Sequence, residues 1–438
     1  MKKNRILLFA MLIGSSICVA QQSRMLTLDE AVEMGIAHSK YLKIDAAKEL
    51  EAKARYESVK NNFLPNLKVS GSALAIANSE VNIEVLFKNP NAASIQTPKP
   101  NSAYFGQANL SLPLFAGGSI RYGIKSAEYL VKAQELSTEN DKNAMAYNIA
   151  QAYNNLFKAS QTIKVLEENL KVAQDRDKHF LSMENNGLIT RNDRLKANLQ
   201  TSNIELQLLD AQNNYSIANM NMDLLLGLPD DTKIEVDPNY TADEKVYTLV
   251  QDYVAEAMQY RKDLQAVQYQ LKAAGMGKKA AKGSYYPQIA LTAGYTAAKI
   301  PKIFSIYNAA NIGIGVQYNL DNLWKKNTSL EQAKAQEQAL QSQSELTTEQ
   351  IRLEVNRDYQ NAILANKKIS VYEKTMQQAA ENYRITKNKF DNGLATMTEL
   401  LEADAAQISA NVGYVNAKAD AALAYKKLMQ TIGKSVIF

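Results

Sequence analysis

The pattern of apolar and polar residues changes period along the chain, from a helical repeat to an alternating one. From Thr27 to Asn62 apolar residues recur at helical spacing, with acidic residues in the first turn. This pattern predicts a helix that ends before Pro65. Apolar and polar residues then alternate over residues 67–75 and again over 104–112. The two-residue period predicts two strands, each with one apolar face.

The second half of the chain shows the same order of patterns. After Pro287, residues 289–295 alternate in polarity, and so do residues 311–320. Two further strands are therefore expected, again with one apolar face and one small, polar face. The segments between paired strands, residues 78–101 and 299–308, are expected to be exposed loops, the first of them rich in Asn, Pro and Ser.

A very long helix is expected after each pair of strands. Proline-free stretches run from Gly118 to about residue 185 and from Asn322 to about residue 392. About 65 residues in a single helix would reach roughly 100 Å. A turn at Gly187 or Gly393 then reverses the direction of the chain. Another helix is expected to follow each turn and to end near Gly227 or Gly433. The first of these return helices carries a narrow leucine stripe suited to packing against other helices: Leu195, Leu199, Leu206 and Leu209.

These parallels predict an internal repeat. Gly187 and Gly393 are 206 positions apart, and several further pairs share that offset: Leu114 with Leu320, Tyr153 with Tyr359, Leu195 with Leu401, and Gly227 with Gly433. Pro65 and Pro287 are 222 positions apart, so the first copy carries extra residues between its strands. We expect a first repeat over residues 21–228, a linker over 229–244 and a second repeat over 245–438.

The first twenty residues have the layout of a secretory signal peptide. A basic start precedes an apolar stretch over residues 6–13 and a small-x-small pattern that ends at Ala20, so the mature chain is expected to begin at Gln21. The alternative is a lipidated Cys18, which the bulky Ile17 before it disfavours. Because Cys18 is the only cysteine, its removal would exclude disulfide frameworks, thiol nucleophiles and cysteine-ligated metals.

Composition narrows the function further. Beyond residue 20 no stretch approaches the roughly 18 apolar residues of a spanning helix, so an exported chain of this kind is expected to be periplasmic or a β-barrel. Loss of three basic residues with the signal peptide leaves 47 basic against 45 acidic residues, which does not point to nucleic acid. His38 and His179 lie in different predicted helices, and catalytic motifs are absent. We expect no enzymatic activity, no cofactor and no metal.

Four membrane strands in one chain require an oligomer. An open sheet edge in hydrocarbon leaves backbone groups unpaired at a cost of several kcal/mol each, and smaller spanning barrels have about eight strands. Two chains would supply eight strands around a filled interior, and three would supply twelve with room for a lumen. The small, polar face of the strands suggests a water-filled lumen, which favours a trimer.

The chain resembles the TolC-like outer-membrane efflux proteins. The resemblance rests on the duplication, on the Leu-Pro-Leu-Phe-Ala-Gly-Gly run at residues 112–118 and on an Asn-Gly-Leu turn in each half. It implies a mixed α and β fold: a trimeric twelve-stranded transmembrane β-barrel, four strands per protomer, continuous with a long periplasmic α-helical barrel. It also implies a passive outer-membrane channel that works with a periplasmic adaptor and an inner-membrane pump, and exports drugs, detergents, metals or proteins.

The resemblance places an acidic constriction near the turn of the second repeat. Glu399 and Glu402 lie three apart at a predicted helix start and share one face, so three copies would form rings of carboxylates. Their repulsion is expected to raise some of their pKa values and to favour cations. The alternative is that glutamate at a helix N-terminus complements the helix dipole. Gly187 and Gly393 would form the periplasmic tips and contact the adaptor.

Two further positions match the family's latch, and one departs from it. Phe390 falls where the family often has a tyrosine, and Asp193 falls on an acidic latch position. Ala395 stands where the family has a latch arginine, so that ion pair is missing. Arg191 or Arg194 could replace it.

Aromatic residues mark the expected edge of the membrane. Tyr318 and Trp324 follow the last strand, where aromatic side chains anchor at membrane interfaces, although ordinary packing is an alternative. A competing class of function is a periplasmic coiled-coil scaffold or adhesin without a pore. That class shares the long helices but does not account for four strands placed alike in both halves.

Overall fold

The computed structural model describes residues 24–77, 99–230, 232–241 and 247–435. The expected signal peptide and most of the expected loop at 78–101 lie outside the described residues. The chain divides into two compact units, and each draws on both halves of the sequence. We call the unit of Ala47–Leu136 and Gln265–Leu346 the strand unit, and the unit of Met1–Ala46, Ser137–Leu264 and Thr347–Phe438 the hairpin unit.

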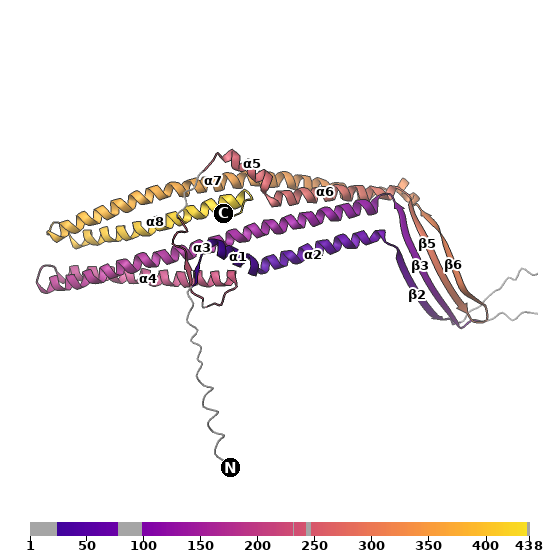
Figure 1. The fold of residues 1–438 in the computed structure, drawn as a ribbon, viewed down its shortest axis with the longest axis horizontal. Helices are drawn as coiled ribbons and strands as arrows, with labels where there is room; N and C mark the ends of the chain where they lie inside the picture. The colour runs from indigo at the N-terminus through magenta and orange to yellow at the C-terminus, as the bar shows by residue number, and fades with distance from the viewer. Residues whose placement is uncertain (1–23, 78–98, 231, 242–246, 436–438) are drawn as a thin grey trace, which may run out of the picture. The chain divides into compact units, whose positions relative to one another are not determined.

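The two halves have almost the same order of elements (Figure 1). The first half contains α1 (Leu28–His38), α2 (Lys40–Lys60), the 3-10 turn η1 (Asn61–Phe63), β2 (Asn66–Ala75), β3 (Ser102–Ala116), α3 (Ser119–Asn185) and α4 (Arg191–Leu226). The second half contains α5 (Val250–Tyr260), α6 (Lys262–Lys282), η2 (Gly283–Tyr285), β5 (Gln288–Ile300), β6 (Phe304–Gln317), η3 (Leu320–Leu323), α7 (Thr328–Asp391) and α8 (Met397–Thr431). Two short strands, β1 (Arg24–Leu26) and β4 (Ile234–Val236), complete the set.

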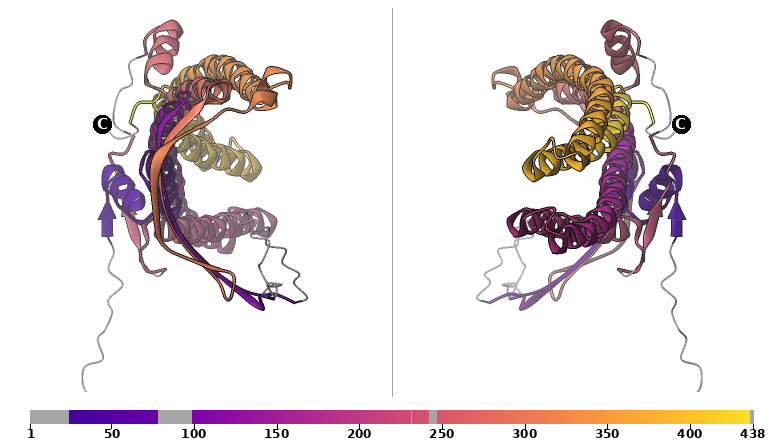
Figure 2. Two further views of the ribbon diagram at one scale, coloured as in Figure 1. Left: turned by 90° about the vertical axis from the view of Figure 1, so that its right-hand side faces the viewer. Right: turned by 90° about the vertical axis from the view of Figure 1, so that its left-hand side faces the viewer.

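The four long strands form one antiparallel sheet in the order β2-β3-β5-β6. The sheet is curved, with β2 and β6 at its two edges (Figures 1 and 2). Every residue of β2 and β6 is exposed in the single chain. The strands that alternation predicted are therefore present, and two of them offer an unpaired edge.

The register places the apolar faces of the four strands together. Residues directly opposite each other in an antiparallel pair lie on the same face. One apolar row across the sheet is Leu67, Leu110, Ala293 and Ile312. The neighbouring row, on the opposite face, is Lys68, Asn109, Gly294 and Asn311. The sheet thus has one apolar and one small, polar face, as the sequence predicts.

The loop expected at residues 299–308 is much shorter in the structure. β5 continues to Ile300 and β6 begins at Phe304, so the connection is a tight turn in which Lys302 has a positive φ of 68°. The register shifts between Thr296 and Ala298, and Asn308, with φ 57°, accepts a hydrogen bond from the Tyr295 hydroxyl at 2.7 Å. This irregularity interrupts the alternation, so a simple period count finds both strands but misses the end of β5 and the start of β6.

The helix expected from Thr27 to Asn62 is broken at Ser39. The Ser39 side chain is the cause, because its oxygen accepts a hydrogen bond from the Leu42 amide at 3.2 Å and starts α2. The second half breaks at the equivalent place, Arg261, between α5 and α6.

The glycines that end α4 and α8 pack directly against these breaks. A Cβ on Gly227 would lie 2.8 Å from the His38 ring, and one on Gly433 would lie 2.8 Å from the Tyr260 carbonyl carbon. Both glycines have positive φ values, of 70° and 81°. Gly227 and Gly433 thus have the same role in the two halves. Each adopts the left-handed backbone conformation that ends its helix and, lacking a Cβ, allows a second chain segment to approach closely.

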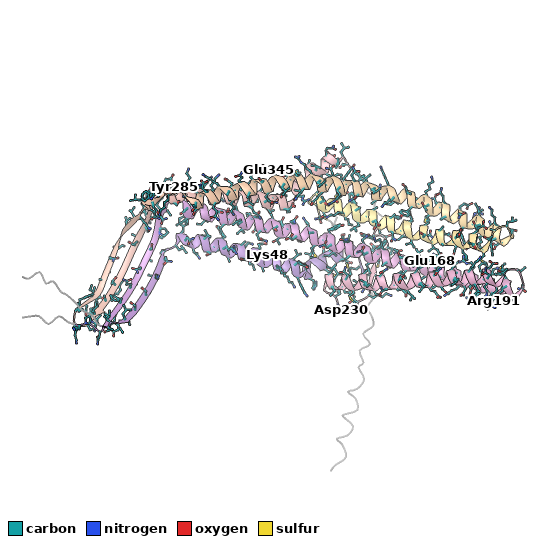
Figure 3. All side chains as sticks on the ribbon, turned by 180° about the vertical axis from the view of Figure 1, so that it is seen from behind. Lys48, Glu168, Arg191, Asp230, Tyr285 and Glu345 are labelled. Carbon is teal, nitrogen blue, oxygen red and sulfur yellow. The ribbon has the colours of Figure 1, made fainter. Side chains whose placement is uncertain are left out.

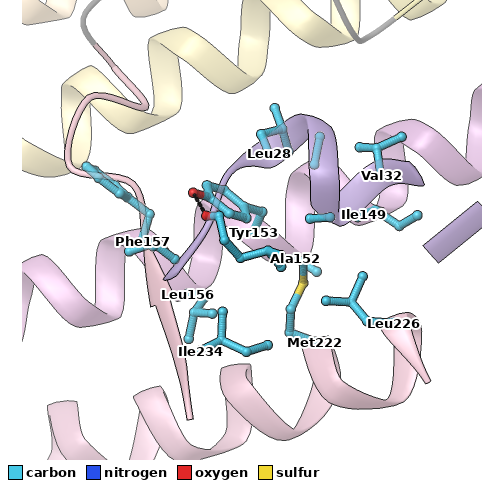
Figure 4. Close-up of a cluster of buried hydrophobic side chains, with 14 of the residues drawn as sticks. Leu28, Val32, Ile149, Ala152, Tyr153, Leu156, Phe157, Met222, Leu226 and Ile234 are labelled. Atoms are coloured by element: carbon cyan, nitrogen blue, oxygen red, sulfur yellow. Dashed lines mark hydrogen bonds between the residues drawn. The ribbon is translucent and has the colours of Figure 1, made fainter. Parts of the chain in front are cut away.

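The first half of the hairpin unit is centred on Tyr153 (Figure 4). Tyr153 is fully buried; its hydroxyl donates to the Leu26 carbonyl and accepts from the Asp237 amide, both at 2.8 Å. Burial is the main cause that raises the pKa of Tyr153 to about 12. The hydroxyl thereby connects α3 to β1 and to the segment that follows β4. β4 itself pairs in parallel with β1. The sequence predicted neither short strand, and β4 lies in the segment expected to be a linker.

The long helices are present at nearly the predicted lengths: α3 has 67 residues and α7 has 64. α7 begins at Thr328 and not at Asn322, because η3 intervenes and the Asn327 side chain caps the Leu330 amide at 3.0 Å. α4 buries Ala197 and Ile204 within the chain. The predicted leucine stripe of α4 does not pack within the chain, since Leu199 is 66% exposed and Leu206 is 60% exposed.

Candidate functional site

The two glycine turns at the ends of the long helices have the same backbone geometry. Gly187 and Gly393 have φ values of 71° and 73°. The Gly187 amide donates to the Glu184 carbonyl and the next amide, Leu188, donates to the Met183 carbonyl, both at 2.9 Å. The turn at Gly393 repeats both bonds. This pair of bonds is the Schellman motif, which needs a left-handed residue and therefore favours glycine. Figure 3 shows Arg191 at the end of the α3–α4 hairpin.

A threonine starts the helix that follows each turn. Thr190 Oγ1 accepts from the Asp193 amide at 3.1 Å and donates to the Asp193 carboxylate at 2.6 Å. Thr396 does the same for Glu399, and its own amide also donates to the Glu399 carboxylate at 2.7 Å. Thr396 and Glu399 thus form a capping box.

This capping box sets the electrostatics of Glu399 in the single chain. The hydrogen bonds from the Thr396 amide and then from its hydroxyl lower the pKa of Glu399. This lowering is opposite to the rise in pKa that repulsion between copies would cause. Within one chain, the contacts of Glu399 are those of a glutamate at a helix N-terminus, which was the alternative interpretation. Glu399 and Glu402 are both exposed, whereas Met397, Leu400 and Ala403 are buried. Both carboxylates are thus solvent-exposed in the single chain, on the side of α8 away from the buried residues.

Phe390 lies in an apolar cluster behind these turns. Its ring meets Phe180 edge-on, with 5.7 Å between ring centroids. The buried members of the cluster come from α3, α4 and the start of α8: Phe180, Ala197, Met397 and Leu400. We call this set the tip cluster. It brings the α3–α4 and α7–α8 hairpins together, and the Lys196 ammonium adds a hydrogen bond to Thr398 at 3.3 Å.

A buried ion pair connects the same two hairpins. Arg176 of α3 and Asp404 of α8 lie 2.6 Å apart, and their side chains are only 11% and 8% exposed. Burial alone would lower the pKa of Arg176, but the hydrogen bond and charge of Asp404 outweigh burial and raise it. Arg176 also hydrogen-bonds Tyr383 of α7. The sequence did not predict this pair, because its partners are 228 residues apart and neither belongs to a motif.

The structure also places the residues around the missing latch arginine. Ala395 is half-buried within the turn. Arg194 forms an ion pair with Glu184 across the first turn, so it already has an acidic partner on its own hairpin. The Asp193 carboxylate lies 3.8 Å from Lys196. Within the described chain, Asp193 is therefore not joined to Phe390 or Glu399, and the predicted latch residues divide between the two hairpins.

The two predicted interface aromatics lie at the end of the sheet in the strand unit. Trp324 follows η3 and is 71% exposed, and Tyr318 follows β6 directly and is 38% exposed. Ordinary packing within the chain thus does not account for the Trp324 ring.

The described residues offer neither a metal site nor a helix that could span a membrane. Across the described ranges, His, Cys, Asp and Glu form no group able to hold a metal ion. His38 and His179 are both exposed and lie in different helices. None of the described helices is both long enough and apolar enough to cross a bilayer.

Comparisons with known proteins agree with this geometry. The family model for outer membrane efflux proteins matches residues 33–228 and 253–434. The outer membrane efflux protein BepC of Brucella suis is 23% identical over 383 residues, which cover 85% of this chain and 82% of BepC.

Two solved structures share the fold. The outer membrane protein VceC of Vibrio cholerae has 19% sequence identity and a TM-score of 0.77, over 93% of this chain and 96% of VceC. CusC, whose structures describe transmembrane channel formation, has 17% identity and a TM-score of 0.80, over 93% of this chain and 92% of CusC. The predicted resemblance is confirmed: the chain belongs to the outer membrane efflux protein family.

Proposed function

We propose that three copies of this chain form a passive channel across the outer membrane, continuous with a helical duct in the periplasm. An inner-membrane pump and a periplasmic adaptor would deliver small molecules to it for export. The duct itself carries no chemistry, so selection of the cargo belongs to the pump. Family membership supports the outer-membrane efflux role.

The sheet with two free edges is the observation that carries this proposal. Its four strands have one apolar face, and β2 and β6 each leave a row of backbone groups unpaired. In hydrocarbon each unpaired group costs several kcal/mol, so the edges must meet partners. Antiparallel pairing of β6 with β2 of the next copy closes the sheet, and three copies give twelve strands around a lumen.

The exposed apolar positions of the long helices support the same assembly. On α4 Leu199 and Leu206 lie seven residues apart, and further exposed apolar side chains follow at intervals of three to eight residues: Leu209, Ile217, Met220 and Leu224. α7 exposes Leu353, Leu364 and Val371. Apolar seams of this length in water mark an interface. We infer that these seams join neighbouring copies and that the two sequence repeats alternate around the duct.

Glu399 and Glu402 are proposed to form the acidic constriction at the periplasmic mouth, beside Asp193 and Phe390. The turns at Gly187 and Gly393 are proposed to contact the adaptor. Three copies of two exposed carboxylates would concentrate cations at the mouth. The capping box supports this role, because it fixes the Glu399 side chain at the first turn of α8.

Single-channel recording tests the proposal. The purified protein in a planar bilayer is expected to conduct ions with a preference for cations. Glu399→Ala combined with Glu402→Ala should lower that preference, whereas Glu373→Ala, which removes another α7–α8 carboxylate, should leave it intact. Unchanged selectivity in the double variant would remove both residues from the constriction. A chain that carbonate washing releases from the outer membrane would instead be a periplasmic scaffold or adhesin.

A further inference from the structure

The end of the sheet nearest α2 and α3 carries an apolar groove that the single chain leaves open. The groove has a volume of about 300 Å³ and its walls include Phe63, Leu114, Phe115, Ile120 and Arg121. Phe63, Leu114 and Phe115 are 48%, 55% and 46% exposed. Phe63 belongs to η1, immediately before β2, so the groove lies beside the free β2 edge. All of these residues belong to the strand unit.

The groove has one cationic wall, which is Arg121. Arg121 is exposed near the start of α3. Arg121 makes no hydrogen bond, ion pair or ring contact with any described residue of the chain. A guanidinium next to aromatic and aliphatic side chains suits an aromatic occupant, because it can stack on the ring while the apolar wall covers the ring edge.

Trp324 has the complementary character and lies at the opposite edge of the sheet. It is the only tryptophan of the chain and is 71% exposed. It follows β6 through η3, where Leu320 is also 59% exposed. An aromatic side chain removes roughly 150–250 Å² of surface from water when it is buried. Burial of the exposed indole in an apolar groove of a second copy would therefore strongly favour contact between the two copies.

The strand register places the two surfaces at the same level. Gln317, the last residue of β6, is opposite Gln288, which is opposite Ala116 in the groove wall. If β6 pairs with β2 of the next copy, the segment after β6 enters the space next to the segment before that β2. The groove and Trp324 would then meet across the boundary between copies.

We propose that Trp324 of each protomer fills this groove on the next protomer and stacks on its Arg121. This inference rests on the proposed trimer and deepens it, because it names a contact that couples neighbouring copies at the base of the barrel. Trp324 would still lie at the level of the membrane interface, but protein would cover its ring in place of lipid.

Fluorescence of the single tryptophan tests the contact in the full-length protein. In vesicles of phosphatidylethanolamine and phosphatidylglycerol, Trp324 should emit at short wavelength and resist quenching by both acrylamide and brominated acyl chains. Arg121→Ala and Phe63→Ala should each shift the emission to longer wavelength and increase quenching. Phe304→Ala, which removes an exposed aromatic from the far end of β6, is the matched control and should change neither.

The oligomeric state, measured by native mass spectrometry on the same samples, separates the possible failures. A trimer in which brominated lipid or acrylamide quenches Trp324 strongly, with no effect of Arg121→Ala, would overturn this contact and leave the proposed channel standing. A sample that is not trimeric would overturn the contact and the proposed assembly together.

Discussion

At the scale of single residues, the turn before α8 combines a structural and an electrostatic role. Thr396 supplies two hydrogen bonds to the Glu399 carboxylate, one from its amide and one from its hydroxyl, and both lower the pKa of Glu399. A group with a lowered folded pKa stabilises the fold above its unfolded pKa, and that contribution is lost as the pH falls through the folded value. The start of α8 is therefore expected to weaken only below the ordinary glutamate value of 4.5.

Thr396→Val should move this transition to higher pH. Valine removes the hydroxyl but keeps the backbone amide, so the pKa of Glu399 should rise part of the way toward 4.5. Cation selectivity in planar bilayers, followed from pH 7 downward, should then be lost earlier than in the unaltered channel. Thr375→Val is the control, because its hydroxyl bonds only to Val371 within its own helix. Identical pH profiles for both variants would show that the cap does not set the charge of Glu399.

The helix-ending glycines differ in what surrounds them although their backbone angles are alike. Alanine at Gly187 should cost about 1–2 kcal/mol from the left-handed conformation alone, because its Cβ would meet open space. Alanine at Gly433 should cost more, because its Cβ would meet the backbone at Tyr260. Gly227→Ala should fall between the two, since the His38 side chain can shift. Denaturant unfolding of the three variants gives the order, and equal losses would contradict this account of the matched glycines.

At the scale of helices and strands, the regular elements could be predicted and the contacts between them could not. Alternation predicted all four long strands, and the absence of proline predicted both long helices. The break at Ser39 carries a local signal, since serine is a common N-cap, but no local signal marks Arg261 as a helix end. β1 and β4 consist of three residues each and pair across more than 200 positions, which a local period cannot detect.

The candidate site divides in the same way. Gly187, Gly393, Thr396 and Glu399 act through bonds within five residues, so their turn and capping geometry follows from local sequence. Arg176 and Asp404 act across two hairpins and became visible only in the fold. The leucines of α4 were expected to pack against other helices, and within one chain they remain exposed. In the proposed trimer these leucines would contact neighbouring copies.

The Arg176–Asp404 pair is expected to hold the two hairpins of one protomer together. Replacing either residue alone by leucine leaves a buried charge without its partner, which costs roughly 3–5 kcal/mol, whereas replacing both should cost much less. Hydrogen exchange of the tip cluster measures this difference. Lys158→Leu or Asp420→Leu alone is the matched control, because that pair also joins α3 to α8 but is 29% and 55% exposed, so either single replacement should cost at most about 1 kcal/mol. Equal effects of the two pairs would contradict the assignment.

At the scale of the whole molecule, the single chain leaves apolar surface open on both kinds of element. The sheet has one apolar face and two free edges, and α4 presents a leucine seam to solvent. The proposed trimer would explain both features, because further copies would cover the apolar surface and pair the strand edges. Charge placed on the seam should therefore prevent assembly without unfolding the protomer. Leu199→Glu with Leu206→Glu should do so, and Asn203→Glu, an exposed position on the same helix, should not.

Native mass spectrometry of the protein extracted from outer membranes in mild detergent shows whether the chain assembles with further copies. We expect a single species with three times the mass of the mature chain, and we expect the Leu199→Glu, Leu206→Glu variant to lose it. A stable monomer whose β2 and β6 amides are fully protected from hydrogen exchange would contradict it, because the strand edges would then be satisfied without a second copy.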